Sequence, residues 1–106
     1  MFIIKVVGRS MEPLIESGKF CVFRDEVAGT RQGKVLLVGH HSITDPDTHS
    51  RYTVKRYRSE KIFEKDETWR HGKIWLEPEN KDYETIELPE SQAEEFRVIG
   101  EFISVI

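Results

Sequence analysis

The apolar residues of this chain fall in short runs interrupted by turn residues, and this pattern restricts the fold more than any other feature of the sequence. The runs are rich in Val, Ile, Phe and Tyr, at a spacing typical of β-strands joined by turns. No window carries an apolar stripe of helical period over three turns, and only Pro13–Glu16 reads as a helical turn. The sequence therefore predicts a mainly β protein, a sheet with a barrel-like body, with strands at Phe2–Gly8, Phe20–Asp25, Lys34–His40, Tyr52–Arg58, Lys61–Lys65, Gly72–Glu77, Glu84–Leu88 and Phe96–Val105.

The length and charge of the chain narrow the classes of protein to which it can belong. Its 106 residues suit a single domain, either one that starts at its first strand or one excised from a longer multidomain protein. A nucleic-acid-binding domain usually has a basic excess, so the net charge of −3 argues against direct nucleic-acid binding. No apolar stretch approaches the ~20 residues of a membrane span, and we expect no membrane contact.

Cys21 is the only cysteine of the chain, so no internal disulfide can form. A single thiol fits a reducing compartment, and we expect a cytoplasmic protein. Its neighbours Phe20, Val22 and Phe23 are apolar. This setting predicts a small buried side chain rather than a nucleophile.

Ser10 is the first candidate for catalysis. It follows the apolar run that ends at Val7 and precedes the turn expected at Pro13. A serine at a strand exit has an exposed hydroxyl beside free backbone N–H groups, which are the parts of a nucleophile with an oxyanion hole. Taken alone, it reads as a serine in a turn or at a helix N-cap, with Pro13 in the first helical turn.

Lys55 is the second candidate, because a serine hydroxyl needs a base to take its proton. It lies in the strand-like segment Tyr52–Arg58 and shares a strand face with Thr53 and Tyr57. A lysine acts as a base only when neutral, which requires burial away from carboxylates. No acidic residue lies within two positions of Lys55. Taken alone it reads as a solvent-facing lysine, and the open question is whether it reaches Ser10.

The chain resembles the peptidase domains of the LexA–UmuD type, which use a serine and a lysine and are related to type I signal peptidases. The resemblance covers nearly the whole length, and its motifs occur in the family's order. They are Gly8-Arg9-Ser10-Met11-Glu12-Pro13-Leu14-Ile15, Gly18–Phe23, Arg31–Val38, Val54-Lys55-Arg56-Tyr57-Arg58, Trp75–Tyr83 and Phe96–Ile103. The family fold is a twisted β-sheet, in agreement with the strand pattern.

The resemblance implies a role for each matching residue. Ser10 would be the nucleophile, Lys55 the general base, and the backbone N–H groups of Arg9 and Ser10 the oxyanion hole. Met11 would contact the substrate, a peptide bound as an extended strand, in cis or in trans. No cofactor and no metal are implied. The resemblance also leaves open a homodimer, a fused DNA-acting domain, and self-processing in a DNA-damage or phage-repressor-like context.

Some segments depart from the family pattern. Lys19 stands where an acidic residue is usual, and the segment His41–Ser50 lengthens the separation between Ser10 and Lys55. The regulatory members carry a DNA-binding domain and an Ala-Gly or Cys-Gly cleavage site before the nucleophile, and residues 1–9 contain neither. Ala28-Gly29 lies after Ser10 and reads as a turn.

Three other functions are consistent with part of the sequence. The first is a catalytically silent member of the fold that serves as a dimerisation or regulatory module. The second is a signal-peptidase-like processing enzyme, which the lack of an apolar anchor disfavours. The third is a small DNA-binding protein, which the acidic balance disfavours.

Several histidines and aspartates cluster in and beside the inserted segment. Imidazole and carboxylate groups are usual metal ligands, but no predicted helix aligns i,i+4 pairs of this cluster on one face, and it has no CxxC spacing. We expect a solvated loop, and nothing in the sequence brings a histidine to Ser10 for a Ser–His–Asp triad. The residues concerned are His40, His41, Asp45, Asp47 and His49, while His71 is expected in an exposed turn.

Overall fold

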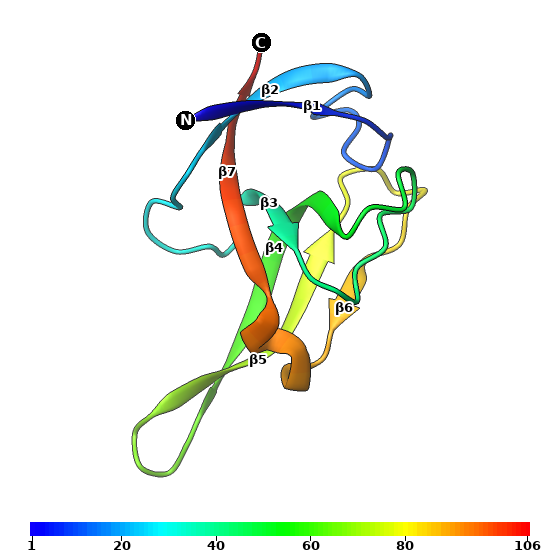
Figure 1. Cartoon of the computed structure of the whole chain (residues 1–106). Coiled ribbons are helices and arrows are strands. Elements are labelled where there is room, and N and C mark those ends of the chain that lie inside the picture. Colours follow the sequence, from blue (N-terminus) through cyan, green and yellow to red (C-terminus); the bar gives the residue numbers. More distant parts are fainter.

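The computed structural model describes residues 1–69 and 72–106 in full, and Arg70 and His71 only as positions within a strand. The expectation for the His71 side chain therefore lies outside the described residues. In the part of the chain that the structure describes, there are seven strands and one short 3-10 helix (Figure 1). They are β1 (Phe2–Val6), β2 (Lys19–Arg24), β3 (Val35–Gly39), β4 (Tyr52–Phe63), β5 (Trp69–Glu77), β6 (Ile86–Leu88), η1 (Glu90–Glu95) and β7 (Arg97–Val105).

All seven strands belong to one antiparallel sheet in the order β1-β2-β7-β3-β4-β5-β6. The sheet curls so that β1 and β2 arch over one end of β3 and β4, but it does not close (Figure 1). The mainly β prediction is therefore confirmed. β1 and β6 are the edge strands, and β1 leads directly to the turn that holds Ser10.

The structure differs from the predicted elements at two places. The segments predicted as separate strands around Ser59 form the single long strand β4, because a β-bulge between Ser59 and Lys61 absorbs the irregularity. The helical element is η1, which the sequence pattern did not predict. The helical turn expected at Pro13–Glu16 is present as a single turn, in which the Ile15 N–H donates to the Met11 carbonyl four residues earlier at 2.9 Å.

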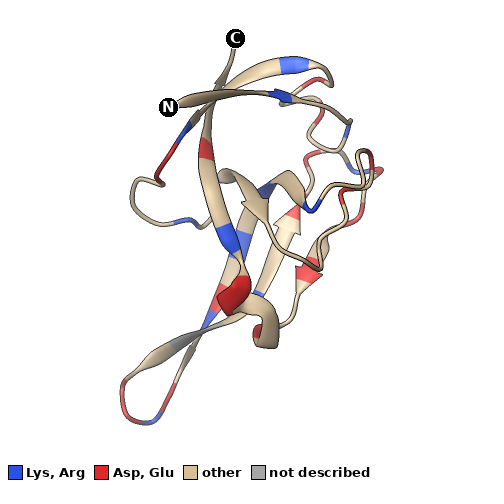
Figure 2. Ribbon diagram, in the orientation of Figure 1, with Lys and Arg blue, Asp and Glu red and all other residues tan. Residues whose placement is uncertain are grey.

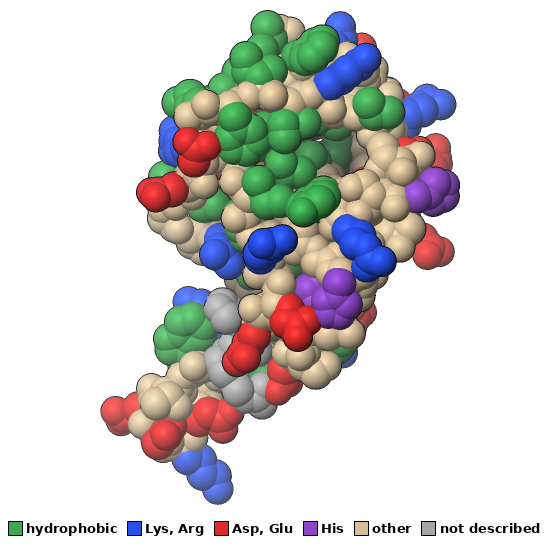
Figure 3. All heavy atoms as spheres, viewed as in Figure 1, with side chains coloured by type: hydrophobic (Ala, Val, Ile, Leu, Met, Phe, Trp, Pro, Cys, Tyr) green, Lys and Arg blue, Asp and Glu red, His purple; other side chains and the backbone are tan. Residues whose placement is uncertain are grey.

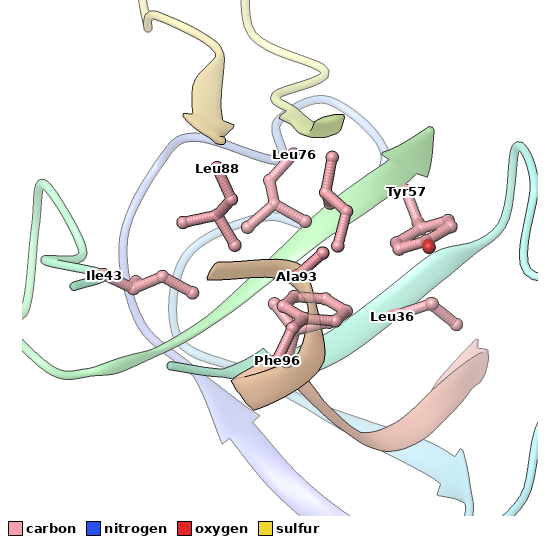
Figure 4. Packing of buried hydrophobic residues seen from close by; sticks show 9 residues of the cluster. Leu36, Ile43, Tyr57, Leu76, Leu88, Ala93 and Phe96 are labelled. Carbon is pink, nitrogen blue, oxygen red and sulfur yellow. The ribbon is translucent and has the colours of Figure 1, made fainter. Parts of the chain in front are cut away.

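Strand β3 separates two hydrophobic clusters because successive side chains point to opposite faces of a strand. Leu36 and Val38 belong to a cluster with Tyr57, Leu76, Leu88 and Phe96 (Figure 4). Val35 and Leu37 belong to the other cluster, with Met11, Ile15, Cys21 and Phe23. All five residues of β3 are buried. The prediction that Cys21 is a small core side chain is confirmed.

Strand β4 places Lys55 on the face of the sheet that carries Leu36 and Val38. Lys55 pairs with Leu36 across the sheet, and Thr53 pairs with Val38. Directly opposed residues in an antiparallel pair point to the same face. Lys55 therefore shares this face of the sheet with buried residues of β3, and its side chain is itself buried.

Charged residues of both signs are distributed over the chain, with an acidic η1 beside the start of β7 (Figure 2). Among the described residues, no helix is long and apolar enough to cross a bilayer.

Candidate active site

Ser10 lies in the turn that follows β1, and its side chain is 6% exposed. Asn80, from the segment after β5, holds this turn in place. Its side-chain amide donates to the Arg9 carbonyl, and its backbone N–H donates to the Ser10 carbonyl, both at 3.0 Å. The turn is therefore fixed by a segment distant in sequence.

Lys55 is 1% exposed, and its Nζ lies 2.7 Å from the Ser10 Oγ. The interpretation of Lys55 as a solvent-facing lysine is therefore wrong, because the turn after β1 folds over its side chain. The Nζ also lies 2.7 Å from the Thr53 Oγ1 and 3.1 Å from the Val54 carbonyl. An ammonium group donates to all three oxygens. A neutral amine donates to Thr53 and Val54, and its lone pair then faces the Ser10 hydroxyl.

Burial lowers the pKa of Lys55 below its ordinary value, because removal from water disfavours the ammonium form. The carboxylates of Asp45 and Asp47 oppose this shift but do not cancel it. The neutral amine is therefore more populated near neutral pH than in an exposed lysine.

Asp45 also belongs to this site, although the sequence pattern indicates only a loop residue or a metal ligand at this position. Its Oδ2 accepts the Thr53 hydroxyl at 2.7 Å and lies 3.9 Å from the Lys55 Nζ. Its Oδ1 accepts the backbone N–H groups of Asp47 and Thr48 at 2.9 and 3.0 Å. Burial alone would raise the pKa of Asp45, but these hydrogen bonds and the charge of Lys55 lower it overall. Asp45 is therefore an ionised carboxylate next to the Lys55 amino group, and both of its oxygens accept hydrogen bonds.

The direction of these hydrogen bonds fixes the Thr53 hydroxyl. Because Thr53 gives its only proton to Asp45, its oxygen can only accept from Lys55. Strand alternation predicts that Thr53 and Lys55 share a face, and the contact between them confirms this prediction. No sequence signal connects Asp45 to Lys55, since it reaches the site through a loop.

The carboxylate of Asp47 lies next to the backbone N–H groups that the resemblance implies for the oxyanion hole. Its Oδ2 accepts the Arg9 backbone N–H at 3.2 Å, and its Oδ1 accepts the Tyr83 hydroxyl at 2.7 Å. Gly8 has a φ of 112°, and a Cβ there would lie 2.6 Å from the Asp47 Oδ2. Glycine at this position thus allows the carboxylate to approach the turn. Of the two backbone groups named for the oxyanion hole, the Arg9 N–H is engaged in this conformation.

A cleft of about 610 Å³ opens beside Ser10 and Thr53. Residues from β1, β3, β4 and β7 form its apolar walls, and Figure 3 shows the hollow among hydrophobic side chains below β1. Met11 lines the cleft and is also part of the core, at 1% exposed. The lining includes Ile4, Val6, Leu37, Val54 and Ile99.

The histidines and aspartates of the inserted segment divide between two places. Asp45 and Asp47 face the Lys55 site, whereas His40 and His41 face Glu95 of η1. His49 is exposed. Among the described residues, no histidine is hydrogen-bonded to Ser10, so the structure gives no support to a Ser–His–Asp triad.

Comparison with known proteins identifies the family of the chain. The family model described as Peptidase S24-like matches residues 1–103. No curated protein matches the chain. The family match spans the Ser10 turn, β4 with Lys55 and the closing strand β7, the segments on which the resemblance to LexA–UmuD peptidase domains depends. The chain therefore belongs to the S24-like peptidase family.

Proposed function

We propose that this protein is a serine endopeptidase in which Ser10 is the nucleophile and Lys55 the general base. The observation that carries the proposal is the 2.7 Å contact between the Lys55 Nζ and the Ser10 Oγ, with both side chains buried. A buried amine with a lowered pKa can accept a proton near neutral pH, and this is what activation of a serine requires.

In the proposed reaction, the Ser10 Oγ attacks the carbonyl carbon of the peptide bond while its proton moves to the Lys55 Nζ. The C–N bond then breaks, and Lys55 returns the proton to the leaving amine. An ester between Ser10 and the acyl part of the substrate remains. Lys55 next takes a proton from water, the resulting hydroxide adds to the ester carbon, and the proton goes back to Ser10 as the acid leaves.

The tetrahedral oxyanion needs N–H donors at the turn. The Ser10 N–H and the Arg9 N–H are the proposed donors, and the Arg9 N–H becomes available only when Asp47 withdraws. Asp47 therefore acts in the proposal as a local obstruction. A substrate carbonyl oxygen would have to displace its carboxylate from the Arg9 N–H.

The proposed substrate is an extended peptide segment with apolar side chains. β1 is an edge strand, so its free edge can pair with such a segment and lead it to Ser10. The apolar walls of the cleft suit side chains that leave water on binding. A segment of the same polypeptide or of a bound partner would reach high effective concentration, which suits a weakly activated nucleophile. Self-processing in a regulatory pathway, of the DNA-damage or phage-repressor kind, is the biological role we propose.

Two readouts test the peptidase proposal with matched control variants. The protein is incubated at mildly alkaline pH with a fused upstream segment and, separately, with an activated ester that can acylate a serine. We expect cleavage and an acyl adduct on Ser10 by mass spectrometry. Ser10→Ala and Lys55→Met should lose both, while the exposed-site controls Ser91→Ala and Lys65→Met should keep both. Unchanged acylation in Lys55→Met would remove the lysine from the mechanism.

One observation also favours a second function, self-association as a regulatory module. Ile3 of β1, Phe20 of β2 and Ile106, which follows β7 and donates its N–H to the Phe20 carbonyl, are 59%, 54% and 70% exposed. Hydrophobic side chains gather at this end of the molecule (Figure 3). A second copy of the chain could cover them. A folded protein that dimerises in sedimentation experiments through Phe20, yet neither cleaves nor acylates, would establish this function instead.

A further inference from the structure

Three side chains with metal-binding atoms converge where the inserted loop leaves β3. His40 and His41 follow the strand, and Glu95 is the last residue of η1. The His41 Nδ1 lies 3.1 Å from the Glu95 Oε2, and the His40 Nε2 lies 3.9 Å from the same oxygen. One ligand atom from each residue lies within 4.8 Å of the others. We propose that His40, His41 and Glu95 form a binding site for a zinc ion.

His40 provides an independent reason to expect a ligand here. Its side chain is fully buried, yet its Nε2 has no hydrogen-bond partner among the described residues. A buried polar atom without a partner is costly, and such atoms usually have one. The Nε2 faces Glu95, so a metal ion between them would supply the missing interaction.

The hydrogen bonds of the His40 Nδ1 decide whether the Nε2 of the same ring carries a proton or a free lone pair for a metal. The Ser42 Oγ lies 2.7 Å from the His40 Nδ1 and 3.0 Å from the Gln92 Oε1. Because Ser42 gives its proton to Gln92, its oxygen accepts a proton from Nδ1, and the Nε2 lone pair is then free. The Ser42 backbone N–H also approaches Nδ1, at 3.0 Å, and favours the other tautomer. Metal binding at Nε2 would select the first arrangement.

The ligand types and their spacing fit zinc. Two imidazoles and one carboxylate are a common protein ligand set for this ion and leave a fourth position for water. With zinc–ligand bonds of about 2.0 Å, ligand atoms in a tetrahedron are separated by about 3.3 Å. His41 and Glu95 have side chains 61% and 64% exposed, so they can move to close the longer separations. His40 is the fixed member.

The pocket around these residues sets the expected affinity. Its volume is about 270 Å³, and Arg51, Tyr52 and Arg97 also line it. Figure 3 shows histidine, acidic and basic side chains gathered between the upper body and the protruding hairpin. The guanidinium of Arg51 donates to the His41 carbonyl. Two nearby positive charges oppose binding of a cation. We therefore expect micromolar affinity, weaker than that of a closed structural zinc site.

Zinc at this site would join the start of the inserted loop to η1. The same loop carries Asp45 and Asp47 to the Lys55 site. Fastening its first residues would reduce the freedom of the loop and stabilise the folded state. The proposal does not depend on peptidase activity, because its readouts are binding and stability.

Titration of the full chain with zinc chloride, after removal of metals by a chelator, tests the proposal. We expect one binding event by calorimetry and a rise in Tm. Glu95→Gln and His41→Ala should each weaken binding at least ~10-fold, and Ser42→Ala should weaken it by about 10-fold through the histidine tautomer. The matched controls Glu94→Gln and His49→Asn should bind as the wild type does.

Cobalt supplies a second readout that reports the ligand set. We expect visible absorption bands of a four-coordinate Co²⁺ site in the wild type, lost in Glu95→Gln and kept in Glu94→Gln. Absence of zinc binding to the folded wild type would overturn the proposal. Equal weakening by His49→Asn and His41→Ala would overturn it as well, because it would indicate adventitious binding by surface histidines.

Discussion

The Thr53 hydroxyl donates its proton to Asp45 at a distance of 2.7 Å. This bond leaves the threonine oxygen only an accepting role toward Lys55, which lies 2.7 Å away. An amine that donates to Thr53 and to the Val54 carbonyl directs its lone pair to the remaining neighbour, the Ser10 hydroxyl. Asp45 thus orients the base Lys55 through the hydroxyl of Thr53. The acidic residue of a Ser–His–Asp triad orients its histidine in a comparable way, but by direct contact.

Replacing Asp45 by asparagine should change both the pH dependence and the maximal rate of peptide cleavage. The charge of Asp45 raises the pKa of Lys55, so its removal lowers that pKa and moves the rising limb of the pH–rate profile to lower pH. The asparagine amide can donate to Thr53 and release the threonine proton toward Lys55, so the plateau should fall roughly 10- to 100-fold. Asp66→Asn, which alters a similar Asp–Thr pair in the β4–β5 turn, is the control. A pH–rate profile of Asp45→Asn with the same maximal rate and the same rising limb as the wild type would exclude an orienting role for Asp45.

Thr53 should tolerate serine but not valine. Thr53→Ser retains the oxygen that accepts from Lys55, whereas Thr53→Val retains the shape and loses the oxygen. We expect kcat near the wild-type value for the serine variant and a loss of about 100-fold for the valine variant. Steady-state kinetics at the optimum pH measure the difference, with unfolding curves to establish that both variants fold. Equal rates in the two variants would contradict the assignment.

Asp47→Ala should increase the rate of acylation. The substitution frees the Arg9 N–H for the oxyanion and removes a charge that raises the pKa of Lys55, and both effects favour reaction near neutral pH. Tyr83→Phe releases one hydrogen bond of the same carboxylate without removing its charge, so a smaller increase is expected. Pre-steady-state acylation with an activated ester gives the rates. A decrease in Asp47→Ala with unchanged Tm would show that the carboxylate assists catalysis instead.

The stability of the folded protein should rise with pH in the mildly alkaline range because of Lys55. Its folded-state pKa is lowered below the ordinary value of 10.5, so between the two values the unfolded chain binds a proton that the folded chain does not. The free energy of unfolding therefore increases with pH until the ordinary lysine pKa is reached. Denaturant unfolding at several pH values measures it. Lys55→Met should remove this slope, and Lys65→Met should leave it intact. If the free energy of unfolding rose equally with pH in both variants, titratable groups other than Lys55 would be its cause.

Much of the architecture was predictable because local patterns control it. Alternating or continuous apolar runs specify strands, and the positive-φ glycines Gly8, Gly18, Gly29 and Gly33 lie in the segments that join them. η1 was not predictable from periodicity, since a six-residue 3-10 helix with Ala93 as its buried residue is too short to produce an apolar stripe. The union of two predicted strands into β4 depended on a bulge, which is decided by pairing with β5.

The sequence by itself determined the strand-rich fold, the family, and the identity of Ser10 and Lys55 as candidates, because residue types and their order along the chain carry that information. Only the tertiary structure decided that Lys55 is buried against Ser10, that Asp45 lies beneath it, and that His40 and His41 lie beside Glu95. Burial and proximity depend on sheet register and loop path, which join residues far apart in sequence. A lysine's pKa is set by those surroundings and not by its neighbours in the chain.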